Sequence, residues 1–236
     1  MTETKKVDHV HGSAGEAVTR AALEELFPGK RFLKTRRLSW LSPLELDGYN
    51  EELNLGFEYH GVQHFKEIPF FHRTPDAFEQ QQERDARKQE LCDDHLSGFV
   101  VVTYETPLVD IRRLVRSQVE DMCYLVPLGE SKMTDTEFIE HTIKNSEHCK
   151  VMLEKVRMIA HDKGGECLST VYIDSFTLMK FKCGVGHIFE QSLQGIDHPA
   201  HKGPRFCTIC GGTKKQTVDE NQRQGRKYGL HLHRNA

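Results

Sequence analysis

The feature that most constrains the fold is a stretch of alternating side chains between Leu44 and Lys66. It reads LELDGYNEELNLGFEYHGVQHFK. Successive side chains on a strand face opposite ways, so the apolar residues of the second half share one face, and Glu58 and His60 share the other. The pattern predicts two strands joined by a tight polar connection, with Asp47 near the end of the first strand.

Asp47 and Glu58 are the candidate metal ligands of this hairpin. If the two strands pair, the two carboxylates converge, and divalent cations take hard oxygen ligands of this kind. An Asp before Gly48 is also a common turn former, which is the alternative for Asp47. Glu58 lies among apolar residues, where an unpaired carboxylate is costly. We therefore expect a site for Mg²⁺ or Mn²⁺ here.

The first 130 residues alternate helical and extended patterns. The expected order is helix, extended segment, hairpin, helix, strand and helix, over 13–27, 32–41, 44–66, 78–95, 99–104 and 111–123. Strands interleaved with helices in this way predict an α/β sandwich. The apolar run FVVVTY at 99–104 indicates a buried inner strand.

The remainder of the chain divides into three parts. The domain organisation expected is a first domain at 1–130, a connecting helix at 134–163, a small metal-binding module at 164–213 and a flexible basic tail at 214–236. Cys183-Gly-Val-Gly-His187 precedes Cys207-Thr-Ile-Cys210, a pattern of two ligand pairs that suits tetrahedral zinc. Four protein ligands leave no open position, so the zinc is expected to be structural. A module of this size has little core and is expected to depend on its metal.

Composition limits the partners and the cellular compartment that we expect for the protein. The net charge of −3 gives no overall basic field, so any nucleic-acid contact must come from local patches. We find neither an apolar run long enough for a membrane span nor a secretory signal pattern, and we expect an intracellular protein without a membrane partner. The seven cysteines show no regular disulfide spacing.

Four segments together resemble the PD-(D/E)XK nuclease superfamily, in particular its branch of very-short-patch repair and homing-type endonucleases. They are ELDGY at 45–49, GFEYHGVQHF at 56–65, RDARKQELC at 84–92 and FVVVTY at 99–104. The resemblance implies a restriction-endonuclease-like fold, with a mixed sheet flanked by helices, followed here by a helix and the small zinc module. The stretch around Cys183 resembles the zinc-ribbon or treble-clef modules that accompany such nucleases.

The resemblance also implies roles for individual residues. Asp47 and Glu58 match the two acids of the family motif, and His60 stands where lysine is usual. His64 resembles a further histidine of the repair-type branch, and Glu16 a helix acid that reaches the metal. The alternatives are passive hydrogen bonding for His60 and His64, and a solvated salt bridge to Arg20 for Glu16. Asp85 and Lys88 resemble a recurrent helix pair, for which a structural role is equally open.

The function expected is that of a metal-dependent endonuclease that hydrolyses DNA phosphodiester bonds, with the zinc module aiding DNA binding. Candidate phosphate contacts are Lys34, Arg36, Arg37, Arg73, Lys202 and Arg205. Two other functions stay open: a non-catalytic DNA-binding protein that retains the nuclease fold, and an RNA-directed nuclease. One active site cuts one strand per event, so cutting of both strands would imply a homodimer or two rounds.

Overall fold

The computed structural model describes residues 13–35, 38–67, 74, 76–126, 133–197 and 206–211. The chain divides into two compact units: Gly15–Ile139, and a second unit that continues from Glu140. Each unit has its own sheet.

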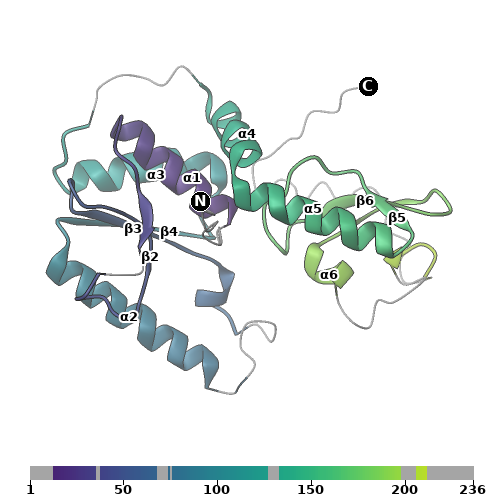
Figure 1. The fold of residues 1–236 in the computed structure, drawn as a ribbon, viewed down its shortest axis with the longest axis horizontal. Helices are drawn as coiled ribbons and strands as arrows, with labels where there is room; N and C mark the ends of the chain where they lie inside the picture. Colours follow the sequence, from purple (N-terminus) through teal and green to yellow (C-terminus); the bar gives the residue numbers. More distant parts are fainter. Residues whose placement is uncertain are drawn as a thin grey trace, which may run out of the picture. The chain divides into compact units, whose positions relative to one another are not determined.

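The first unit is a mixed four-stranded sheet with helices on both faces. Its strands lie in the order β1-β2-β3-β4, and α1 and α3 cover one face while α2 covers the other (Figure 1). The elements are α1 (Ala14–Leu26), β1 (Leu33–Thr35), β2 (Leu46–Asn50), β3 (Leu55–His60), the 3₁₀ turn η1 (Val62–His64), α2 (Ala77–His95), β4 (Gly98–Thr103) and α3 (Leu108–Asp121). The α/β class and the mixed sheet expected from the sequence are confirmed.

The predicted hairpin is present as the antiparallel pair β2–β3. Its ladder joins Gly48 to Phe57 and Asn50 to Leu55, and a turn at 51–54 connects the strands. The FVVVTY segment forms β4, which runs parallel to β3 with Glu58 opposite Val101. This parallel neighbour places β3 inside the sheet, so Glu58 is held on an inner strand and is 4% exposed.

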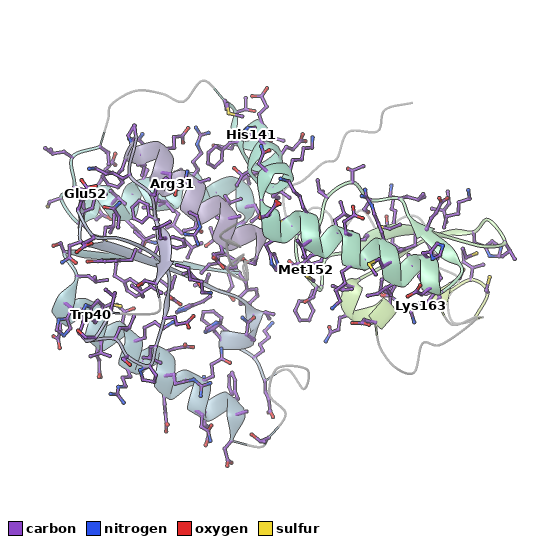
Figure 2. All side chains as sticks on the ribbon, viewed as in Figure 1. Arg31, Trp40, Glu52, His141, Met152 and Lys163 are labelled. Carbon is purple, nitrogen blue, oxygen red and sulfur yellow. The ribbon has the colours of Figure 1, made fainter. Side chains whose placement is uncertain are left out.

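Helix α2 packs on the sheet with few apolar side chains of its own. Of its 19 residues only Cys92 is buried, where it joins a small core with Leu41 and Leu46. Trp40 stacks on His95 at the end of α2, with ring centroids 4.7 Å apart (Figure 2). Because so little of α2 is apolar, polar side chains of the helix also face the sheet, as Lys88 does toward Glu58 on β3.

The extended segment expected at 32–41 is shorter in the structure. Among the residues of this range that the structure describes, which leave out 36 and 37, only Leu33–Thr35 forms a strand, and its pairing with β2 is irregular. The backbone N–H groups of Leu41 and Ser42 both donate to the Leu38 carbonyl, so the chain turns there instead of continuing along the sheet.

The second unit combines two helices with a three-stranded antiparallel sheet. Its elements are α4 (Asp135–Asn145), within which the division between the units falls, α5 (Glu147–Asp162), β5 (Gly165–Cys167), β6 (Met179–Cys183), β7 (Ile188–Gln191) and α6 (Leu193–Asp197). The sheet order is β5-β6-β7, with both pairs antiparallel. Within the described residues, no helix combines the length and apolar character that a membrane crossing needs.

The single connecting helix expected at 134–163 is two helices. Ser146 has extended backbone angles and its side chain accepts a hydrogen bond from the Cys149 N–H, which begins a new helix. The N–H of Ser146 closes the preceding turn on the Thr142 carbonyl. The apolar pattern continues through this point, which is why the sequence indicated one helix.

Helix α5 belongs to the core of the module that carries the cysteines. Leu153, Val156 and Ala160 pack in one cluster with Phe181 of β6 and with Phe206, which directly precedes Cys207. Figure 2 marks Met152 along this helix and Lys163 at its C-terminal end. The module therefore has a larger core than residues 164–213 alone would provide, so its folding need not rest on a metal ion alone.

Candidate active site and metal centre

Asp47 and Glu58 lie side by side where the β2–β3 ladder ends, and each carboxylate bonds to the opposite strand. The Asp47 N–H donates to Glu58 Oε1 at 3.0 Å, and the Tyr59 N–H donates to Asp47 Oδ2 at 3.0 Å. These reciprocal bonds take over from the backbone ladder, whose last pair is Gly48 with Phe57. One oxygen of each carboxylate is thereby fixed.

The other oxygen of each carboxylate faces a lysine. Lys88 Nζ on α2 donates to Glu58 Oε2 at 2.9 Å, and the Lys34 Nζ on β1 lies 3.6 Å from Asp47 Oδ1. The side chains of Lys88 and Glu58 are 15% and 5% exposed, so this pair is largely removed from water. Asp47 Oδ1 and Glu58 Oε2 are the two oxygens directed away from the backbone, and they are the donors that a hard divalent cation would use.

Glu16 approaches the same site from α1 through Arg20. The Arg20 guanidinium donates to Glu16 Oε1 at 2.8 Å and to the Asp47 carbonyl oxygen at 2.6 Å. It also donates to the Phe32 carbonyl and lies over the Phe57 ring, 5.1 Å from its centroid. The i,i+4 salt bridge of Glu16 with Arg20 is therefore real, but it is partly buried and is tied to the backbone of Asp47 instead of lying in solvent.

The close approach of α1 to β3 depends on Gly15. A Cβ atom on Gly15 would lie 2.1 Å from the Tyr59 ring. Because only glycine fits against that ring, the first turn of α1, and with it Glu16, comes near the end of the hairpin. The three acids do not share one tight ligand group, since their oxygens do not all lie within 4.8 Å of one another. Asp47 and Glu58 are the pair whose carboxylates bond to the backbone of each other's strand.

The electrostatics of the cluster favour protonation of two of its acids. Burial raises the pKa of Glu58 to about 7, with the Asp47 charge adding to the increase and Lys88 opposing it. Burial likewise raises the pKa of Glu16 to about 7, again with a contribution from Asp47, against Arg20 and Lys34. Both carboxyls are disfavoured as anions by the same two causes, loss of water and the neighbouring Asp47 charge.

His60 and His64 lie together beside this cluster. Their rings are stacked, with centroids 4.6 Å apart and planes inclined by 10°. His64 Nδ1 lies 2.6 Å from Asp85 Oδ2 on α2, so Asp85 fixes the orientation of that imidazole. Burial lowers the pKa of His60, and His64 lowers it further. His60 is thus favoured in its neutral form.

A second group of ligands lies in the other unit. Cys183, His187, Cys207 and Cys210 have ligand atoms that all lie within 4.8 Å of one another, so this cluster could hold a metal ion such as zinc. His187 presents Nδ1, 3.3 Å from Cys210 Sγ. Among the residues that the structure describes, no other set of three or more Cys, His, Asp or Glu side chains is gathered this closely.

The two ligand pairs are held by backbone turns and by aromatic packing. The Gly186 N–H bonds to the Cys183 carbonyl, and Gly186 takes a φ of +94°, which favours glycine. The ring centroids of Phe206 and Phe189 lie 5.0 Å apart, and the two ring planes are inclined by 85°. This contact anchors the chain directly before Cys207. Two sheet strands and one aromatic anchor therefore bring together pairs that are 20 residues apart in the sequence.

Most of the expected phosphate contacts lie outside the described residues. These are Arg36, Arg37, Arg73, Lys202, Arg205 and the basic tail at 214–236. Lys34 is described, and it faces Asp47 instead of open solvent. It is thus a partner of the acidic cluster as well as a candidate contact for phosphate.

Three residues of the cluster were given no catalytic role from the sequence. Lys88 and Asp85 were recognised as a helix pair, and their i,i+3 spacing indicates a shared face, but not that this face meets Glu58 and His64. Arg20 was considered only as a salt-bridge partner of Glu16. Its contact with the Asp47 backbone has no sequence signal, because 27 residues separate the two.

Three cysteines of the described residues, Cys92, Cys123 and Cys149, lie well away from the metal cluster in the sequence. Cys92 and Cys149 are buried, whereas Cys123 is exposed and adopts a positive φ of 63°. Burial raises the pKa of the Cys92 thiol to about 12, and the Glu58 charge adds to it, so this thiol is unreactive. None of Cys92, Cys123 and Cys149 belongs to the metal cluster.

Comparison with known proteins finds two uncharacterised viral relatives. Protein 307L of Invertebrate iridescent virus 6 is 39% identical over 82 residues, which cover 35% of this chain and 41% of that protein. Protein 033L of Invertebrate iridescent virus 3 is 32% identical over 120 residues, which cover 49% of this chain and 61% of that protein. The chain thus spans about half the length of the relatives it matches. No family model and no solved structure matches it.

Proposed function

We propose that this protein is a divalent-metal-dependent nuclease whose active site is the cluster around Asp47 and Glu58. The observation that carries the proposal is the convergence of two carboxylates from paired strands, each with one oxygen fixed by the neighbouring backbone. Such an arrangement is suited to hold a metal ion in one position. The sequence resemblance to PD-(D/E)XK nucleases points the same way.

Asp47 Oδ1 and Glu58 Oε2 would hold the ion, Mg²⁺ or Mn²⁺. When bound, the ion lowers the pKa of a water ligand and neutralises charge on the phosphate in the transition state. Side chains of the protein supply the remaining charge and the proton transfer. Lys88 provides a positive charge beside Glu58, although His60 stands in the usual lysine position of the motif.

His64 is the candidate to orient the attacking water or to transfer its proton. Its ring is positioned by Asp85 through Nδ1, which leaves Nε2 as the nitrogen that can serve a substrate. His60 stacks on it and is favoured as a neutral imidazole, which limits repulsion between the two rings. The restriction-endonuclease-like fold, the DNA substrate and a DNA-gripping role for the zinc module are parts of the same proposal.

The test is a cleavage assay with Mg²⁺ or Mn²⁺ on supercoiled, linear and branched DNA and on RNA. Asp47→Asn and Glu58→Gln should each lose at least about 100-fold in rate, because each removes a charged metal ligand. Glu52→Gln is the matched control, since Glu52 is an exposed turn acid that pairs with Lys30. Cleavage of RNA alone would establish the RNA-directed alternative.

Absence of cutting on every substrate would overturn the proposal. Tight DNA binding in that case would establish a non-catalytic DNA-binding protein. Equal cutting by wild type and both variants would show that the activity arises elsewhere. Supercoiled DNA also separates nicking from double-strand breaks, and a double-strand product with a second-order dependence on protein would indicate a dimer.

A further inference from the structure

Lys34 and Lys88 meet the two carboxylates at the oxygens that a metal ion would need. Lys88 Nζ lies 2.9 Å from Glu58 Oε2, and Lys34 Nζ lies 3.6 Å from Asp47 Oδ1. The partner oxygens, Glu58 Oε1 and Asp47 Oδ2, are bound by backbone N–H groups. A divalent cation and the two ammonium groups therefore compete for the same pair of oxygen atoms.

The two lysines differ from the third cation of the cluster in how firmly they are held. Arg20 donates to three acceptors on α1, β2 and the segment before β1, and its guanidinium packs over Phe57. A lysine ammonium is a compact charge on a flexible four-carbon stem. The side chains of Lys34, Arg20 and Lys88 are 30%, 24% and 15% exposed, so exposure does not separate them. The difference lies in their contacts: each lysine faces one carboxylate of the pair, whereas Arg20 is held by three acceptors.

We propose that Lys34 and Lys88 are exchangeable counterions, which compete directly with the divalent metal for Asp47 Oδ1 and Glu58 Oε2 and so set the metal concentration at which the site fills. This inference rests on the proposed function. It assigns the two lysines a role in controlling metal binding that is separate from any contact with substrate. Displaced from the carboxylates, both ammonium groups stay within reach of the site as positive charges for a phosphate.

Calorimetric titration of the zinc-loaded full chain with Mg²⁺ tests the inference without any substrate. The measurement is made at about pH 9, so that protons do not compete for the carboxylates. Lys34→Met and Lys88→Met keep the side-chain length and remove the charge. Each should lower the Kd for Mg²⁺ at least about threefold, because an opposing cation close to the ligands is gone. Lys30→Met, whose partner is the exposed turn residue Glu52, should leave it unchanged.

The outcomes separate this inference from the proposed function. Mg²⁺ binding by wild type that Asp47→Asn abolishes, with equal or weaker binding in both lysine variants, overturns the exchange and leaves the metal site standing. No Mg²⁺ binding by wild type overturns both. If Lys88→Met fails to fold, Lys34→Met alone decides, because Lys34 lies on a short edge strand with 30% of its side chain exposed and a substitution there should disturb folding less.

Discussion

Lys88 Nζ donates to Glu58 Oε2 at 2.9 Å, so a lysine from α2 lies against the carboxylate that begins the E-x-H motif on β3. The nuclease motif that this segment resembles usually has lysine where this chain has His60. On the proposed function, the positive charge at the site comes instead from Lys88, 30 residues further along the chain than Glu58. Tertiary packing thus places a charge that the local pattern does not show.

The pair of Lys88 with Glu58 should be a strong contributor to the stability of the first unit. Lys88→Met leaves a nearly buried carboxylate without its cation, and we expect the free energy of unfolding to fall by about 2–4 kcal/mol at about pH 8. Urea unfolding followed by the fluorescence of Trp40, the only tryptophan of the chain, measures it. The double variant Lys88→Met with Glu58→Gln should lose less than the two single variants summed.

A surface pair provides the control for that measurement. Arg113 and Asp110 form an i,i+3 pair on α3, in the same unit as Trp40, and their side chains are 81% and 38% exposed. Arg113→Met should change stability by no more than about 0.5 kcal/mol. A Lys88→Met effect of the same small size would show that the buried pair is not strongly coupled.

Stability should depend on pH through Glu16 and Glu58. Both have a pKa of about 7 in the folded chain, above the ordinary value of 4.5 that applies when it is unfolded. Between these values the folded state binds more protons than the unfolded state, so stability falls as pH rises from about 4.5 to about 7 and the effect levels off above that. Urea midpoints measured across this window should decline by less in Glu16→Gln than in wild type. If the urea midpoint fell equally with pH in wild type and in Glu16→Gln, the pH dependence would not arise from Glu16.

Loss of Cys210 should remove the metal but leave most of the second unit folded. Cys210→Ser should lower bound zinc from about one equivalent per chain to nearly none, measured by elemental analysis. The helical far-ultraviolet circular dichroism of the chain should change little, because Leu153 and Val156 pack in one cluster with Phe181. The thermal midpoint of the second unit should drop. Cys123→Ser, which changes an exposed thiol outside the cluster, should retain zinc. A fall in helical signal as large as the 16 residues of α5 contribute would show that the core depends on the metal.

Asp85 should matter for turnover and not for metal binding. Asp85→Asn weakens the 2.6 Å contact that orients His64, and on the proposed function we expect cleavage to slow by about 10–100-fold. The Kd for Mg²⁺ should stay unchanged, since Asp85 is not a metal ligand in the proposal. Asp93→Asn, on the exposed side of the same helix with Gln89 as its partner, is the control. A change in metal affinity with Asp85→Asn would assign the residue to the metal site instead.

The hairpin could be predicted from the sequence because its signal is local. Alternation over Leu55–His60 fixes which side chains share a face, and the polar turn fixes the pairing. The parts contributed by α2 could not be predicted in the same way. With Cys92 as its only buried residue, the helix has no apolar stripe to show which face meets the sheet, so the positions of Asp85 and Lys88 depend on tertiary packing.

The Cys/His cluster could be predicted for a similar reason, since each of its two pairs is local. The residues that cover the apolar face of α5 could not be predicted from the sequence. Apolar residues at Leu153, Val156 and Ala160 predict a helix with one buried face, but the 3.6-residue period does not identify what covers that face. The interruption at Ser146 has a local cause, a serine side chain that caps the next helix, and the continuing apolar pattern concealed it.

The reciprocal bonds of Asp47 and Glu58 have a consequence for how this chain can vary. The two residues meet because the turn at 51–54 has the length that sets Gly48 opposite Phe57. An insertion or deletion of one residue would shift one strand against the other and separate the two carboxylates. Among descendants of this sequence, the turn should therefore keep its length for as long as the site is under selection. Its last residue should vary least, because Asn54 has a positive φ of 45° and bonds to Tyr49 and to the His95 carbonyl.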